Sequence, residues 1–365
     1  MKKFLLFATA VGMTLTSCVN DEEATMMDTR SVIAFDAPAL KTSRANVLGE
    51  ISGVKYPTTE RFKVFCKIYS GNYKGWTTSE GIADYFKVAG GDEAKHEGGT
   101  YWSTETIYYW PDAGYKLAFA AISPSILGNA CTTAGTTIAR EEAGFKITNF
   151  ATENDSEKQY DLMYSHTTYD RDKSNNSSSA VSLLFEHALT SIVFSSQKAD
   201  NTVDYIITDV TVNGDFFTQG NFNQGITGTT SGSIYTEEEN PEWTDLANKI
   251  TVNYVPKSGA SINVPAASPE IFTSETSAIL PIPQTVPDNA SVTVVYKKTT
   301  NSTTTTHTKT ILLKDFKKAD NSSIANWERG KRYVYRIAFG ANERIYFEPS
   351  VTDWVQEPTL IYTIK

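Results

Sequence analysis

The sequence is poor in the residues that usually build metal sites and disulfide frameworks. It has 3 cysteines and 4 histidines in 365 residues. The histidines are far apart and show no short metal-binding spacing; they are His96, His166, His187 and His307. The chain also lacks a G-x-S-x-G elbow, a phosphate loop and a dinucleotide fingerprint. We therefore expect no catalytic residues, no metal, no cofactor and no enzymatic activity.

An excess of positive charge is missing as well. The chain has 33 Lys and Arg against 42 Asp and Glu, which gives a net charge of −9. Proteins that bind nucleic acids need a basic surface to neutralise phosphates, so no nucleic-acid partner is expected. Beyond the N-terminal segment there is no apolar run of the roughly 18 residues that a membrane-spanning helix needs. The sequence therefore predicts no membrane-spanning helix.

The first 17 residues have the pattern of a secretory signal peptide. Lys2 and Lys3 precede an apolar stretch over residues 4–15, which is too short to span a bilayer. Leu15-Thr16-Ser17-Cys18 resembles a bacterial lipobox, and this resemblance implies cleavage before Cys18 and acylation of Cys18. The acidic run at residues 21–23 resembles the surface-export signal of Bacteroidota lipoproteins. It implies display on the outer face of the outer membrane, with an inward-facing lipoprotein as the alternative.

The other two cysteines are isolated in the sequence. In the segment RFKVFCKIY, residues 61–69, apolar residues alternate with polar ones, which places Phe62, Val64 and Cys66 on one face of a strand. Cys66 is therefore predicted to be a small buried hydrophobe. A disulfide between Cys66 and Cys131 stays open at this stage.

Almost every segment after residue 30 has the pattern of a short β-strand. Runs of β-branched and aromatic residues are bounded by Gly, Pro, Asn or Asp, with turn signals about every 8 to 12 residues. One short helix is expected over residues 78–87. The polar stretch at residues 171–180 predicts a loop or domain junction. The pattern as a whole favours an all-β protein with two sandwiches in tandem, over residues 45–175 and 176–365.

Two dipeptides predict the positions of hairpin turns. Asn213-Gly214 follows an alternating strand and is a strong two-residue turn signal. Asn301-Ser302 lies within a threonine-rich run that has apolar flanks, which predicts a hairpin with a polar tip. The chain is also rich in aromatic residues, with 6 Trp, 19 Tyr and 18 Phe. Exposed rings could stack on sugars, but we expect Trp110, Trp327 and Trp354 to fill cores or seal turns.

Seven motifs occur in an order that resembles the fimbrillin-like proteins, the lipoprotein pilins of type V pili in Bacteroidia. They are TSRAN (42–46), YYWPDAGYKLAFAAISP (108–124), DLMYS (161–165), SLLFEHALTSIVF (182–194), LPIPQTV (280–286), WERGKRYVYRIAF (327–339) and SVTDW (350–354). The resemblance implies two tandem transthyretin-like β-sandwich domains behind a lipoprotein signal peptide. It implies a structural or adhesive pilus subunit whose partners are other pilin subunits. Before processing, a lipid would anchor it in the outer membrane, and a host or bacterial surface receptor is a further expected partner.

The resemblance also implies proteolytic processing. In type V pilins an arginine-specific, trypsin-like protease removes the lipidated N-terminus together with the first strand. Here Arg44-Ala45 occupies the matching place, so residues 18–44 would be a removable tether and strand. A cut at Arg30 is a second candidate, but it would leave the strand on the protein. The alternative is that Arg44 is an ordinary loop residue in a protein that stays anchored.

The family mechanism further implies that the vacated groove accepts a strand from another subunit. The candidate donor strand is the tail over residues 359–365, in which Leu360, Tyr362 and Ile364 fall on one face. The alternative is a last strand that pairs within its own domain. The competing hypothesis for the whole protein is a surface glycan-binding lipoprotein that stays membrane-anchored and uses exposed aromatic side chains. An adhesin at a pilus tip would combine the two.

Overall fold

The computed structural model describes residues 31–37, 56–87, 90–125, 132–176, 180–199, 201–259, 261–266, 268–273, 278–316, 322–340 and 345–353. Within these ranges nearly every element is a strand. The described helices are three single turns: η1 (Ser156–Lys158), α1 (Lys173–Asn176) and η3 (Leu313–Asp315). None of them is long enough to cross a membrane. The prediction of an all-β protein is confirmed.

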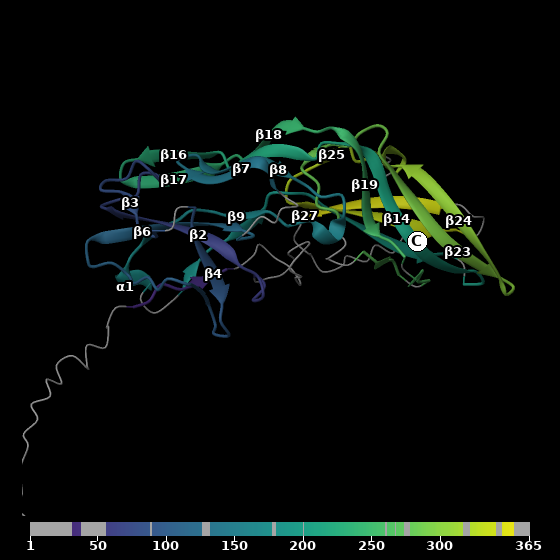
Figure 1. Cartoon of the computed structure of the whole chain (residues 1–365), viewed down its shortest axis with the longest axis horizontal. Coiled ribbons are helices and arrows are strands. Elements are labelled where there is room, and N and C mark those ends of the chain that lie inside the picture. The colour runs from purple at the N-terminus through teal and green to yellow at the C-terminus, as the bar shows by residue number, and fades with distance from the viewer. Residues whose placement is uncertain are drawn as a thin grey trace, which may run out of the picture.

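The first sheet has ten strands and lies at one end of the elongated molecule (Figure 1). Its path runs β11 (Val181–Ser182), β1 (Phe35–Asp36), β5 (Trp102–Thr104), β4 (Asp92–His96), β2 (Phe62–Ser70), β6 (Tyr115–Ser123), β9 (Met163–Ser165) and β12 (Phe185–His187). Two further strands join off this path, β10 (Thr168–Arg171) beside β6 and β3 (Ala83–Asp84) beside β2. The first described strand, β1, therefore lies between two neighbours rather than at an edge.

A second sheet packs against one face of the first. Its order is β18 (Glu242–Ala247), β15 (Gln219–Asn223), β8 (Gly144–Ala151) and β7 (Thr132–Glu141). A separate hairpin is formed by β16 (Ile226–Ser231) and β17 (Ile234–Glu239), and Figure 1 shows it above the first sheet. The second sheet thus joins strands from residues 132–151 to strands from residues 219–247.

Two more sheets form the other end of the molecule. One has the order β21 (Glu270–Ile271), β13 (Ser191–Lys198), β26 (Lys331–Phe339) and β27 (Ile345–Asp353). The other has the order β19 (Ile250–Lys257), β14 (Asp204–Phe216), β23 (Ser291–Thr300) and β24 (Thr303–Leu312), with β20 (Ile262–Asn263) also pairing with β14. A small ladder joins β22 (Gln284–Thr285) to β25 (Asn326–Trp327). The β13–β26 pair is parallel and continuous, whereas most other pairs are antiparallel.

The buried apolar side chains form three clusters. One lies between the two C-terminal sheets and includes Phe194 and Tyr335. The second covers one face of the first sheet, and the third fills the space between the first and second sheets. Val193 of β13 belongs to the third cluster, although its neighbours Ile192 and Phe194 belong to the first. Strand β13 therefore connects the cores of the two ends, because its opposite faces pack into different clusters.

The sheets continue across the predicted junction. Strands β11 and β12 follow residue 176 but pair within the first sheet, and β15 and β18 pair beside β8. The division into sandwiches over residues 45–175 and 176–365 stays a prediction.

One predicted turn is wrong. Asn213 and Gly214 do not form a hairpin, because β14 runs straight through them as one strand of thirteen residues. A Cβ atom on Gly214 would lie 2.8 Å from the Phe216 ring and 3.0 Å from the Cα atom of Ala290. The glycine is therefore explained by close packing, which the turn statistics of the dipeptide do not reveal.

The helix expected over residues 78–87 is also absent; β3 occupies part of that segment. Gly81 has a φ of +64°, a left-handed value that interrupts a helical turn. Two other predictions are confirmed. Asn301 and Ser302, with φ values of 48° and 65°, form the tip between β23 and β24. Cys66 is buried on the same face of β2 as Phe62 and Val64, and Cys131 lies outside the described residues.

Candidate functional site

Several predicted site residues lie outside the described parts of the chain. They are the lipidation residue Cys18, the processing residues Arg44 and Ala45, and the donor residues Leu360, Tyr362 and Ile364. Their roles stay predictions. The strand that precedes Arg44 is described, however, and its surroundings define the groove that its removal would open.

Residues 31–37 are hydrogen-bonded along both edges. On one edge, the backbone N–H groups of Val181 and Leu183 donate to the carbonyl oxygens of Ala34 and Asp36, both at 2.8 Å. This pairing is parallel, with Phe35 opposite Val181.

On the other edge, the N–H of Ile33 donates to the Tyr108 carbonyl at 2.8 Å, and the N–H of Trp110 donates to the Ser31 carbonyl at 3.0 Å. Phe35 pairs with Trp102 of β5 on this side. Residues 31–37 therefore lie between two segments that are far apart in the chain, one near residue 108 and one near residue 181. The pairing with β11 is parallel, and such a pairing needs a long connection between the two strands.

Alternate side chains of this strand enter the core. Ile33, Phe35 and Ala37 are each at most 2% exposed, whereas Val32 is 49% exposed. The Phe35 ring contacts Phe119 edge-on at 5.7 Å between centroids and Phe86 at 6.3 Å. Full burial of a phenylalanine side chain contributes about 1.5–3 kcal/mol. Alternate side chains of the segment thus fill apolar pockets in the core.

Removal of this segment would leave an open groove. Its floor would be apolar, because Phe86, Phe119 and Trp102 lie against Phe35 or pair with it. Its two edges would present the backbone groups that now bond to residues 31–37. Buried backbone groups without partners are costly, so the groove favours another extended segment with alternating apolar side chains.

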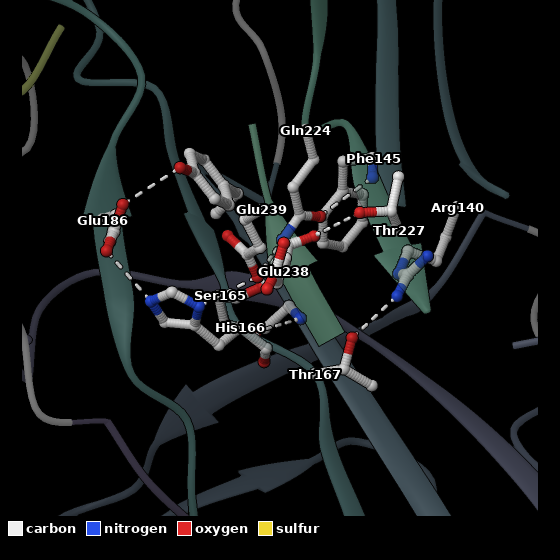
Figure 2. Close-up of polar contacts among 12 residues, drawn as sticks. Arg140, Phe145, Ser165, His166, Thr167, Glu186, Gln224, Thr227, Glu238 and Glu239 are labelled. Carbon is white, nitrogen blue, oxygen red and sulfur yellow. Dashed lines mark hydrogen bonds and ion pairs between the residues drawn. The ribbon is translucent and has the colours of Figure 1, made fainter. Parts of the chain in front are cut away.

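A second arrangement of interest is a charged network beside the β16–β17 hairpin (Figure 2). His166 follows β9, and its ring nitrogens lie 2.9 Å from a carboxylate oxygen of Glu186 and 2.8 Å from one of Glu239. Arg329, in the turn before β26, donates to Glu186 at 3.0 Å. Gln224 donates to the same Glu239 oxygen that accepts from His166, at 2.9 Å.

The network shifts the pKa values of His166 and Glu186 in opposite directions. The hydrogen bonds that His166 donates to the carboxylates of Glu186 and Glu239 raise its pKa to about 10, so the ring is a cation that donates from both nitrogens. The hydrogen bond from His166 and the contact with Arg329 lower the pKa of Glu186 to about 2. A histidine that is already protonated cannot accept a further proton, so His166 is not a general base in this arrangement.

The network therefore holds separate elements of the fold together through hydrogen bonds and ion pairs. It borders a cavity of about 450 Å³ and connects β12, β17 and the turn before β26. Sequence reasoning missed it, because Glu186 and Glu239 are 20 and 73 residues from His166 and no local spacing links them. Among the described residues, no three His, Cys, Asp or Glu side chains group in a way that could hold a metal ion.

The described tryptophans form no exposed row. Trp76, Trp102, Trp110 and Trp327 are buried. Trp243 is half-buried, and its indole N–H donates to the Ala188 carbonyl at 2.7 Å. The prediction that Trp110 and Trp327 fill cores is confirmed, and Trp354 lies outside the described residues.

Comparison with known proteins gives a consistent result. A model of the fimbrillin-like family matches residues 72–354. The structure resembles a fimbrial protein from Bacteroides vulgatus, with a TM-score of 0.55 and 16% sequence identity over 89% of this chain and 100% of the other. A candidate cell adhesion protein from Bacteroides uniformis has a TM-score of 0.46 and 13% identity over 90% of this chain and 99% of the other. No curated protein sequence matches the chain significantly.

Proposed function

The chain belongs to the fimbrillin-like family, and on this premise we propose that it is a structural or adhesive subunit of a type V pilus that assembles by donor-strand exchange. The observation that carries the proposal is the position of residues 31–37. They are hydrogen-bonded along both edges and insert Ile33, Phe35 and Ala37 into the core. A strand in such a place is one that another chain could replace.

The proposed life cycle begins with export as a lipoprotein acylated at Cys18 and displayed on the outer membrane. A protease then cuts after Arg44 and makes Ala45 the new N-terminus. The groove that β1 leaves accepts the tail of another subunit, with Leu360, Tyr362 and Ile364 as the side chains that enter the pockets. Backbone pairing supplies the affinity in this mode of recognition, and the alternating side chains supply the register.

Two features support a subunit role over the competing glycan-binding lipoprotein. That alternative calls for a flat or concave row of exposed Trp or Tyr rings, and no described tryptophan supplies one, because all five are buried or half-buried. The alternative also gives no reason for the first strand to be bonded to a neighbour on each side. As a subunit or adhesin, the protein has no enzymatic role.

The decisive experiment is intact-mass analysis and N-terminal sequencing of the protein recovered from the surface of its own cells. The proposal expects an N-terminus at Ala45 in material that migrates as oligomers resistant to SDS. An acylated Cys18 on the whole population, with only monomers present, would contradict the proposal. That result would favour a permanently anchored lipoprotein.

A further inference from the structure

A cavity outside the groove is lined in part by Lys173 and Ser174, the first residues of α1. Figure 1 shows α1 at the end of the molecule far from the β23–β24 hairpin. The volume of the cavity is about 710 Å³. Small-molecule sites usually measure about 300–1,000 Å³ and combine an apolar lining with a few polar groups. Three segments form the walls, namely residues 71–72, residues 111–116 and residues 172–174.

The walls are held in place by the sheet below them. Ser70 pairs with Tyr115 in the β2–β6 ladder, which brings the first two segments side by side. The third segment follows Asp170, whose carboxylate accepts hydrogen bonds from the Tyr69 hydroxyl at 3.1 Å and the Lys116 ammonium at 2.9 Å. The cavity is therefore formed by the folded chain itself and needs no rearrangement to receive a ligand.

The cavity is lined by an exposed aromatic ring and by polar side chains that are available to bond to a ligand. Tyr115 is 50% exposed. Within the described chain, the side chains of Asn72, Asp112 and Tyr115 make no hydrogen bond to another residue. Gly71 and Gly114, with φ values of +71° and +98°, have no heavy atom within 4 Å of the place where a Cβ would be. A ligand can thus approach the backbone of both turns closely.

The charges of the cavity balance. Lys116 is paired with Asp170, and Asp172 accepts hydrogen bonds from Ser174 and Asn175. Among the lining groups this leaves Asp112 and Lys173, which carry opposite charges, for a ligand, so the site favours neither an anion nor a cation as such. Carboxylates accept hydrogen bonds, ammonium groups donate them, and an amide such as that of Asn72 does both. A ligand with many hydroxyl groups and no net charge can use all three kinds of group at once.

We propose that this cavity binds a neutral sugar, with one face of a pyranose ring against Tyr115 and its hydroxyls bonded to Asn72 and Asp112. The face of a tyrosine ring carries partial negative charge, which attracts the polarised C–H bonds on one side of a pyranose. The site would give the subunit an adhesive contact. It is complete in one chain, so the proposal does not depend on strand exchange.

The test uses the chain from Asp21 onward, which retains every described residue, as a soluble monomer. Saturation-transfer NMR is recorded with the methyl glycosides of glucose, galactose, mannose, fucose and N-acetylglucosamine, and a titration follows for those that respond. Sialic acid and glucosamine serve as anionic and cationic comparisons. We expect at least one neutral glycoside to bind and to bind more tightly than either charged sugar.

Matched variants then locate the site. Tyr115→Ala should weaken binding about tenfold or more, Tyr115→Phe should retain most of it, and Asp112→Asn should weaken it. Tyr101→Ala removes a tyrosine of similar exposure, 43%, that does not line the cavity, and it should leave binding unchanged. An unchanged melting temperature confirms that each variant is folded. The proposal is overturned if no neutral glycoside binds, if only a charged sugar binds, or if Tyr115→Ala binds as well as the wild type.

Discussion

The backbone N–H of Tyr56 donates a hydrogen bond to the carbonyl oxygen of Ala37 at 2.9 Å. Ala37 and Tyr56, the described residues on either side of positions 38–55, are therefore hydrogen-bonded directly to each other. Any cut between these two residues, including one after Arg44, would sever the covalent link of β1 to the body. It would not disturb the contacts of β1 on either edge.

The first prediction concerns this cut. After digestion of the chain from Asp21 onward by an arginine-specific protease, the fragment that carries residues 31–37 should stay bound to the body. Its backbone bonds and buried side chains persist, because none of them depends on the severed link. Size-exclusion chromatography with mass detection should show both fragments in one peak, and denaturant should separate them. Arg44→Ala should prevent cleavage at that site, and release of the fragment without denaturant would contradict the prediction.

The second prediction measures how firmly β1 is held. Phe35→Ala should lower the free energy of unfolding by about 3–5 kcal/mol, because it removes a fully buried ring and leaves a cavity. Val32→Ala on the same strand should change it by no more than about 0.5 kcal/mol, because Val32 is largely exposed. Urea denaturation of both variants makes the comparison. Equal effects would mean that the ring of Phe35 does not anchor the strand.

The third prediction concerns the pH dependence of the His166 network. The pKa of His166 is raised to about 10 in the folded protein, above about 6.5 in the unfolded chain. Its stabilising contribution is therefore fully present below about pH 6.5 and is lost as the pH rises toward 10. The contribution of Glu186 to stability changes with pH in the opposite direction. It is present above the unfolded pKa of about 4.3 and is lost as the pH falls toward 2.

The measurement is urea denaturation of the wild type and His166→Gln at about pH 5.5, 7.5 and 9.5. The variant should be less stable by about 1–2 kcal/mol at the lowest of these pH values, a modest cost because His166 is 37% exposed. The difference in the free energy of unfolding between the wild type and the variant should become smaller at the highest pH. Lys95→Gln breaks the surface ion pair with Glu97 and should leave the shape of the pH profile unchanged. A constant gap for His166→Gln would show that the ring is not held as a cation.

The fourth prediction tests the packing explanation for Gly214. Gly214→Ala should destabilise the protein by about 1–3 kcal/mol, because the new methyl group would press against the Phe216 ring and the backbone of Ala290. Gly99→Ala is the matched control, since no heavy atom lies within 4 Å of its Cβ position, and it should cost no more than about 0.5 kcal/mol. Thermal denaturation compares the two. A neutral Gly214→Ala would disprove the packing explanation.

The fifth prediction concerns the buried thiol of Cys66. Burial raises its pKa, so little reactive thiolate is present in the folded state. In a Cys131→Ser variant that starts at Asp21, Cys66 should react with an aromatic disulfide reagent roughly a hundredfold more slowly than in urea. Thr304→Cys in the same background supplies an exposed thiol, which should react at once. Rapid labelling of Cys66 in the native protein would place it at the surface.

Local patterns in the sequence predicted features that depend only on neighbouring residues, such as the buried face of a strand or the position of a turn. Alternation over residues 62–66 predicted the buried face of β2, and Asn301-Ser302 was predicted as a turn because it is a polar tip between apolar flanks. Gly214 was misinterpreted for a related reason. A glycine required by a neighbour 76 residues away, Ala290, looks the same in the sequence as one required by a turn.

Long-range features could not be predicted in this way. The parallel pairing of β13 with β26 joins segments more than a hundred residues apart, and no periodicity in either strand identifies its partner. The His166 network could not be predicted for the same reason, because it joins residues from five separate segments. The existence of a first strand could be predicted from the β-branched and aromatic run at residues 31–35, but its position between two neighbours depends on partners near residues 108 and 181.

The two-edged pairing of residues 31–37 has a mechanical consequence. A strand at the margin of a sheet can be peeled away one bond at a time by a weak force. A strand bonded on both sides cannot be peeled, because its neighbours block sideways motion, and it must slide out along its own axis. A pull in that direction loads both ladders in shear, and their bonds must fail together. A replacement strand seated in the same groove would give the joint between two subunits high tensile strength.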